Sequence, residues 1–280
     1  PVLVNNWEAT MFDFNQRKLL ALAKEASSLG AELFVLDDGW FGERDDDTSS
    51  LGDWTPAGKK LPGGLSALAD KVRALGLSFG IWVEPEMINR DSELYRAHPD
   101  WAIATPGRTP TPGRHQLVLD LVRADVRSWL VETMSAVFAS AKIDYVKWDM
   151  NRNISDAYSP ALSPQYSALS PAASQPASLS GAALSPEAPE MDAPASDGVS
   201  AWNVSPGSQH RQGEFHHRYI LGLYEVMGEL VRRFPDILFE SCASGGNRFD
   251  LGMLCYMPQI WTSDNRSEEH TSELQSRQVI

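Results

Sequence analysis

The sequence predicts an α/β fold, an incomplete (β/α)8 TIM barrel with about six of its eight strands. Short apolar runs of strand length alternate with longer segments that have a 3.6-residue apolar period. This alternation indicates a parallel sheet with helices outside it. Acidic residues also follow most of the apolar runs. Because the chemistry of such barrels lies at the C-terminal ends of the strands, these acids predict a site as well as a fold.

Six segments are predicted strands, since each is a short apolar run with β-branched or aromatic residues. In chain order they are residues 2–4, 32–36, 77–83, 143–148, 237–239 and 260–261. A closed barrel needs two more. An unclosed barrel exposes sheet edges and half of its core. We therefore expect this chain alone to be poorly stable and weakly active.

Four segments with an apolar stripe are predicted helices. They are residues 15–29, 65–75, 123–141 and 214–234. The first two end before Gly30 and Gly76, a residue type that favours helix C-termini, and the last ends before Pro235. Each predicted helix precedes a predicted strand, as a repeated β-α unit requires.

The composition of the chain limits the kinds of binding partner and cellular compartment that we expect. Of the 280 residues 42% are hydrophobic, which supports a packed core, and the net charge of -13 argues against nucleic acids and anionic membranes as partners. No apolar run reaches transmembrane length. The two cysteines, Cys242 and Cys255, are too few for a disulfide framework and fit a reducing compartment. We expect a cytoplasmic protein.

The expected domain organisation is one partial catalytic barrel over residues 1–265. Residues 165–212 are rich in Ser, Ala and Pro, and we interpret them as a low-complexity insertion after the fourth strand. The chain begins at Pro1 without Met, so we expect it to be the middle of a longer protein. Residues 266–280 are a predicted non-native tail, because 266–276 resembles a translated sequencing adapter.

Seven carboxyl groups are candidates for chemistry because they lie at predicted strand ends: Asp37, Asp38, Glu84, Glu86, Asp149, Glu240 and Asp264. For any one of them, a structural hydrogen bond or a loop cap is an equally good interpretation. We assign no catalytic role to Glu84 and Glu86, which flank Pro85 in what we interpret as a shaped turn.

Local context distinguishes Asp149 and Asp264. Asp149 lies among Lys147, Asn151 and Arg152, whose hydrogen bonds and charge favour an ionised carboxylate. Asp264 follows an apolar, aromatic segment, a setting that favours a protonated carboxyl. One ionised and one protonated carboxyl about 5–5.5 Å apart are what retaining glycoside hydrolysis needs.

Five short motifs occur in a specific order. They are Leu-Asp-Asp-Gly-Trp-Phe at 36–41, Gly-Ile-Trp-Val-Glu-Pro-Glu-Met at 80–87, Lys-Trp-Asp-Met-Asn-Arg at 147–152, Glu-Ser-Cys-Ala-Ser-Gly-Gly at 240–246 and Trp-Thr-Ser-Asp-Asn at 261–265. In these motifs the chain resembles the bacterial α-galactosidases of glycoside hydrolase family 36. The resemblance covers residues 1–265 apart from the Ser/Ala/Pro-rich segment.

The resemblance implies a retaining α-galactosidase in which Asp149 is the nucleophile and Asp264 the acid/base. It implies these substrate-binding residues: Trp7, Asp37, Asp38, Trp82, Arg114, Lys147, Asn151, Cys242 and Gly245. It further implies a small oligosaccharide substrate of the melibiose or raffinose type, no metal, no organic cofactor, and a parent protein that is a homotetramer. The family's flanking domains are absent from this chain.

Other interpretations stay open. Trp7 and Trp82 fit barrel-core residues, and Cys242 fits a small buried apolar residue. Residues 45–47 are most simply a solvated acidic loop, and His216 with His217 is too little for a metal centre. The rival functions are a galactosyl-transferring transglycosylase of the same family, a non-catalytic sugar-binding protein and a non-functional truncated fragment.

Overall fold

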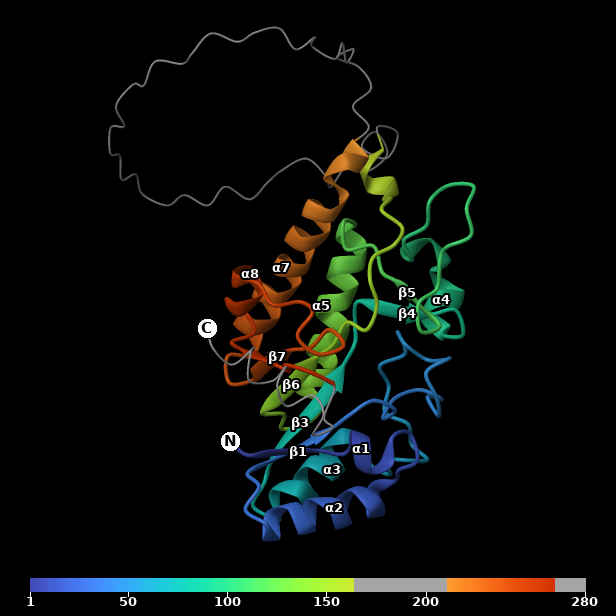
Figure 1. Ribbon diagram of the computed structural model, residues 1–280. Coiled ribbons are helices and arrows are strands. Elements are labelled where there is room, and N and C mark those ends of the chain that lie inside the picture. Colours follow the sequence, from blue (N-terminus) through green and yellow to red (C-terminus); the bar gives the residue numbers. More distant parts are fainter. Residues whose placement is uncertain (164–210, 265–280) are drawn as a thin grey trace, which may run out of the picture.

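The computed structural model describes residues 1–163 and 211–264 (Figure 1). Most of the predicted insertion at 165–212 therefore lies outside the described residues, as do Asn265 and the predicted tail at 266–280. Only Arg211 and Gln212 of the predicted insertion are described, and they begin the 3-10 helix η3 (Arg211–Glu214).

Six parallel strands form one curled sheet in the order β1-β2-β3-β6-β7-β8 (Figure 1). Their bounds are β1 (Leu3–Asn5), β2 (Leu33–Leu36), β3 (Ser78–Val83), β6 (Tyr145–Trp148), β7 (Leu238–Ser241) and β8 (Gln259–Ile260). Strand order follows chain order throughout, as in a (β/α)8 barrel. The predicted fold class, an incomplete barrel with six strands, is confirmed.

Four long helices cover the sheet and agree with the predicted segments. They are α2 (Gln16–Ser28), α3 (Gly64–Arg73), α5 (Ala124–Ala139) and α7 (Phe215–Arg233). The Asn15 side chain caps α2 by accepting from the Lys18 amide at 3.1 Å. Gly30 follows α2 with φ of 90°, the left-handed conformation that ends a helix. No helix among the described residues has the length and apolarity to span a membrane.

The sheet interior explains why the predicted strands read as continuous apolar runs. Every residue of β2 and β6 is buried. Strands that are covered on both faces carry apolar residues without alternation. The helices pack on the sheet with residues at helical spacing, such as Leu19, Ala23 and Ala26 of α2.

A small antiparallel sheet of β4 (Met87–Asn89) and β5 (Gln116–Val118) was not predicted. Three-residue strands are too short for a period, and their partners lie far apart in the chain. The remaining short elements are α1 (Trp7–Thr10), α4 (Glu93–Ala97), η1 (Pro99–Trp101), η2 (Pro160–Leu162) and α8 (Leu251–Leu254). The segment between β4 and β5, which contains α4 and η1, also carries Arg114.

Helix α7 approaches the start of α5 most closely at Gly222. A Cβ atom there would lie 2.2 Å from the Leu121 carbonyl oxygen and 3.0 Å from Arg127 Cδ. Side-chain movement relieves the second contact, but only a backbone shift relieves the first. Gly222 therefore sets the distance between these two helices.

We predict that Gly222→Ala lowers the free energy of unfolding by about 1–3 kcal/mol, because overpacking forces the backbone apart. Gly228→Ala on the same helix is the control, since the nearest atom to its new Cβ is Tyr256 Cε1 at 3.5 Å. Alanine is the better helix former by about 1 kcal/mol, so the control keeps or raises Tm. Thermal unfolding compares the two, and equal Tm values would contradict the close approach.

Candidate active site

Because neighbouring strands are paired in a fixed register, the side chains at their ends lie at the same levels along the sheet, where a level is a row of paired residues. Trp82 pairs with Lys147, and Lys147 pairs with Glu240. Asp37 follows the last pair between β2 and β3, so it joins the same level. Two residues further along the strands, Glu84 and Asp149 directly follow the last pair between β3 and β6. Side chains two residues apart share one face of a strand, so both levels project into the same space.

Asp149 directly follows β6 and is 5% exposed. Its Oδ2 accepts hydrogen bonds from Trp82 Nε1 at 2.9 Å and from Asn151 Nδ2 at 2.7 Å. Its Oδ1 accepts from the Met150 amide at 2.8 Å. All three contacts are N–H donors, which match the acceptor-only carboxylate form. The side chain is therefore held in one orientation from both sides.

Two of the hydrogen-bond donors predicted for Asp149 donate to other groups instead. Arg152 turns away, and its guanidinium donates to the carbonyl oxygens of Thr111 and Gln116 at 2.8 and 2.7 Å. The prediction that Arg152 holds Asp149 is wrong, because its guanidinium binds backbone carbonyls of β5 and of the segment before it instead. Lys147 donates to Asp37 rather than to Asp149.

Asp37 and Lys147 form a buried ion pair with Nζ and Oδ2 3.2 Å apart. Burial works to lower the pKa of Lys147, but the charges of Asp37 and Asp149 outweigh it and raise the pKa. The ammonium group therefore stays charged. Its Nζ also lies 4.5 Å from the centre of the Trp261 ring, a cation–π contact that links β6 to the segment after β8.

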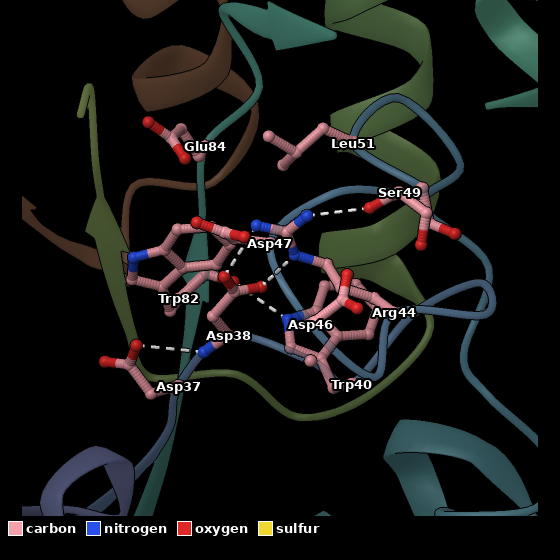
Figure 2. A network of polar contacts seen from close by, with 12 residues as sticks. Asp37, Asp38, Trp40, Arg44, Asp46, Asp47, Ser49, Leu51, Trp82 and Glu84 are labelled. Atoms are coloured by element: carbon pink, nitrogen blue, oxygen red, sulfur yellow. Dashed lines mark hydrogen bonds and ion pairs between the residues drawn. The ribbon is translucent and has the colours of Figure 1, made fainter. Parts of the chain in front are cut away.

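Asp38 is held by Arg44, a residue that the sequence analysis did not identify (Figure 2). The guanidinium binds both carboxyl oxygens, at 2.5 and 2.8 Å, and also the Ser49 carbonyl at 2.7 Å. Burial raises the pKa of Asp38, and the adjacent Arg44 charge opposes this rise. Arg44 is 1% exposed, so the pair is desolvated. Bidentate geometry fixes the position of the carboxyl group.

Asp264 lies on the segment after β8 and is exposed. Its Oδ1 accepts from Trp261 Nε1 at 3.0 Å. The predicted apolar setting is therefore wrong, because the segment turns its aromatic ring toward Lys147 and leaves the carboxyl group facing solvent. Gly245 has φ of 88°, and a Cβ there would lie 3.0 Å from Ser263 Cα. This glycine lets the loop after β7 approach the segment that carries Asp264.

One hollow of about 150 Å³ collects most of the predicted site residues. Its lining comprises Trp7, Glu8, Asp37, Asp38, Trp82, Arg114, Lys147, Asp149, Asn151 and Asp264. Glu8 was not predicted, although it directly follows Trp7 in the first strand-end segment. Of the predicted residues, Cys242 and Gly245 are outside this lining. Burial and the Asp149 charge raise the pKa of the Cys242 thiol, which keeps it neutral.

A larger hollow of about 1150 Å³ lies elsewhere, between α3 and α5. It is lined by residues such as Trp54, Leu65 and Trp129, and it contains none of the predicted site residues. Size alone would favour it, but its walls bring together no set of buried polar groups. We therefore assign the active site to the smaller hollow, where buried carboxyl groups converge.

The described residues contain no cluster of three or more His, Cys, Asp or Glu side chains placed to hold a metal ion. The loop at 45–47, expected to be solvated, is exposed at two of its three acidic residues. Asp45 and Asp46 are exposed, and Asp46 accepts from the Thr48 amide and hydroxyl. His216 lies against the ring of Phe215 on α7, with the ring centres 5.3 Å apart.

A curled parallel sheet with a carboxyl-lined hollow at its strand ends defines part of an α/β-barrel protein with a polar binding site. The sequence profile of the Melibiase family matches residues 1–173 and 199–277. The chain belongs to this family. The resemblance to family 36 α-galactosidases inferred from the motifs is thereby confirmed.

Similar proteins are α-galactosidases. The chain is 51% identical over 265 residues to alpha-galactosidase AgaA of Geobacillus stearothermophilus and 48% identical to alpha-galactosidase 1 of Pediococcus pentosaceus. Each alignment covers 95% of this chain and 30% of the relative. The crystal structure of AgaA matches with a TM-score of 0.81 and 50% identity, over 99% of this chain and 32% of AgaA. The chain thus spans about a third of these relatives.

We predict that Arg44→Met in the complete protein lowers the free energy of unfolding by about 3–5 kcal/mol, because it leaves Asp38 buried and unpaired. Galactose affinity falls as well, since Asp38 loses its fixed position in the hollow. Thermal unfolding and calorimetric titration measure the two effects.

Lys59→Met is the matched control for Arg44→Met. Lys59 pairs with Glu43 in the same loop at 3.3 Å, but both side chains are exposed. Exposed pairs contribute little, so we expect no measurable change in either quantity. If Arg44→Met resembled this control, Arg44 would not be the group that holds Asp38.

Proposed function

We propose that the protein containing this chain is a retaining α-galactosidase that removes terminal α-linked galactose from small oligosaccharides. The observation that carries the proposal is the convergence of Asp149 and Asp264, from different strand ends, on one hollow lined by polar groups. Two carboxyl groups facing one sugar-sized space are the requirement for glycoside cleavage, and the resemblance to family 36 favours cleavage with retention. The family and its α-galactosidase relatives support the same activity.

The proposed reaction is a double displacement. Asp149 attacks C1 of the galactose, the bond to the departing oxygen breaks, and Asp264 donates a proton to that oxygen. Asp264 then removes a proton from water, which attacks C1 and releases Asp149 and galactose. Trp82 and Asn151 hold Asp149 in one orientation, so the attacking carboxylate needs little rearrangement. The exposed position of Asp264 gives it access to solvent water.

The remaining residues of the hollow suit the recognition of sugar hydroxyls. Asp37 and Asp38 offer carboxyl oxygens, and Lys147 and Arg114 offer N–H donors. Asp38 is nearly buried, so an epimer that leaves it without a hydroxyl partner loses binding energy. The crystal structures of AgaA in complex with raffinose and with stachyose support oligosaccharides of this type as substrates.

Two rival functions use the same site differently. A transglycosylase also needs Asp149 and Asp264 but passes galactose to a second sugar, which requires the acceptor to displace water at the exposed Asp264 side. A non-catalytic sugar-binding protein needs neither carboxyl group in position. The relatives at 51% and 48% identity are named for galactoside cleavage, which favours hydrolysis.

We predict that Asp149→Asn lowers kcat toward nitrophenyl α-galactoside by roughly 10³-fold or more, because the amide cannot attack C1. Galactose binding is retained, since the volume is unchanged and the amide oxygen still accepts from Trp82. Steady-state kinetics and calorimetric titration with galactose test both points.

Asp144→Asn provides the control for this substitution. Asp144 precedes β6 at its other end and pairs with Arg73, away from the hollow. We expect its kcat to equal that of the unmodified protein even where Tm falls. Near-normal turnover of Asp149→Asn would remove Asp149 from the nucleophile role.

A further inference from the structure

Glu84 is a buried carboxyl group that the proposed reaction does not use. It directly follows β3 and lies level with Asp149 across the last pair between β3 and β6. It is 0% exposed and is not among the residues that line the hollow. It therefore has no route to a sugar hydroxyl, and its contribution must act through its protein neighbours.

Both oxygens of Glu84 bind neighbours of the site. Oε1 accepts from the backbone amide of Asn151, and Oε2 accepts from Gln116 Nε2 at 2.9 Å. The Asn151 side chain in turn donates to Asp149 Oδ2 at 2.7 Å. Ser244 donates to the other end of that amide, Oδ1, at 3.0 Å. A continuous chain of contacts thus runs from Glu84 through Asn151 to Asp149.

The surroundings of Glu84 disfavour its charge. No ion pair joins it to a basic side chain in the part of the chain that the structure describes, and Arg44 is committed to Asp38. Burial, reinforced by the neighbouring Asp149 charge, raises the pKa of Glu84 to about 8, while Asn151 and Arg44 oppose this and Asp38 adds to it. At neutral pH Glu84 therefore favours its neutral, protonated form.

Gln116 is able to accept a hydrogen bond from a protonated Glu84. Its Oε1 is buried and has no hydrogen-bond partner among the described residues. Rotating the amide by half a turn exchanges its oxygen and nitrogen and presents Oε1 to Glu84 Oε2, at the distance now spanned by Nε2. Glu84 then donates its O–H to Gln116 and still accepts from Asn151.

We propose that Glu84 is a positioning residue: it retains its proton, fixes the backbone of Asn151, and through the Asn151 amide holds Asp149 in the orientation for attack. The inference rests on the proposed function of the site. A neutral acid at this place supplies the hydrogen bonds without adding a second negative charge beside Asp149. An ionised Glu84 would repel the carboxylate that it helps to orient.

The kinetic test compares Glu84→Gln with Glu84→Ala in the complete protein. Glutamine keeps the shape, accepts from Asn151 and donates to Gln116, so it retains most of kcat. Alanine frees Asn151, and misplacement of the attacking group lowers kcat by about 10²-fold. KM for nitrophenyl α-galactoside stays nearly unchanged in Glu84→Gln, because Glu84 does not line the hollow and Asn151 keeps its place there. A loss in Glu84→Gln as large as that in Glu84→Ala would overturn the inference, as would full activity of Glu84→Ala.

The proton retained on Glu84 is tested by measuring the stability of the protein as a function of pH, a measurement that does not depend on enzyme activity. Folding raises the pKa of Glu84 from 4.5 to about 8. The stability from this retained proton is complete below the lower value and is lost as pH rises through the upper one. Glu84→Gln has no such proton, so its Tm rises relative to that of the unmodified protein between about pH 5 and pH 8.

The two tests separate the two proposals. A protein that does not cleave any α-galactoside contradicts the proposed function, but a Tm difference that grows with pH still supports the retained proton on Glu84. A Tm difference that stays constant over this range overturns the inference even when the enzyme is active. If Glu84→Ala fails to fold, the comparison of Glu84→Gln with the unmodified protein decides alone.

Discussion

The feature on which the site depends is the concentration of buried carboxyl groups at one end of the sheet. Asp37, Asp38, Glu84 and Asp149 are each less than 10% exposed and follow adjacent strands. Parallel strands in matched register place them there together, because every strand ends at the same edge. Several buried negative charges repel one another, so each group needs its own compensation.

Each carboxyl group is compensated in a different way. A lysine pairs with Asp37, and an arginine binds Asp38 through two of its three guanidinium nitrogens. Asp149 receives three N–H donors instead of a cation, which leaves its charge available to the reaction we propose. Glu84, as we propose, keeps its proton and so carries no negative charge that needs a partner. These separate solutions let an attacking carboxylate exist among neighbours of the same sign.

The elements around the sheet supply these compensating groups. The loop between β2 and α3 carries Arg44, and the β4–β5 sheet carries Gln116. The loop after β7 approaches the segment of Asp264 closely at Gly245. Loops therefore provide some of the partners, such as Arg44, and strand residues provide others, such as Lys147 and Trp82, for carboxyl groups that follow the strands.

The framework of the site could be predicted from sequence because it follows from periodic patterns. The apolar runs predicted the strands, and residues that follow those strands, including Asp149, line one hollow. The partners in loops could not be predicted, since no pattern says where a long side chain turns. Arg44 lies in an irregular loop and still binds Asp38, whereas Arg152, three residues from Asp149, turns to backbone carbonyls.

We propose above all that Asp149 is the group that forms a bond to the sugar. The most direct measurement is mass spectrometry of the complete protein after reaction with a fluorinated α-galactoside that forms the glycosyl ester and hydrolyses slowly. Trypsin cuts after Lys147 and Arg152 and so releases residues 148–152, in which Asp149 is the one acidic residue. We expect the added mass of the sugar on this peptide. A label on a peptide that carries Asp37, Asp38 or Asp264 would contradict this proposal.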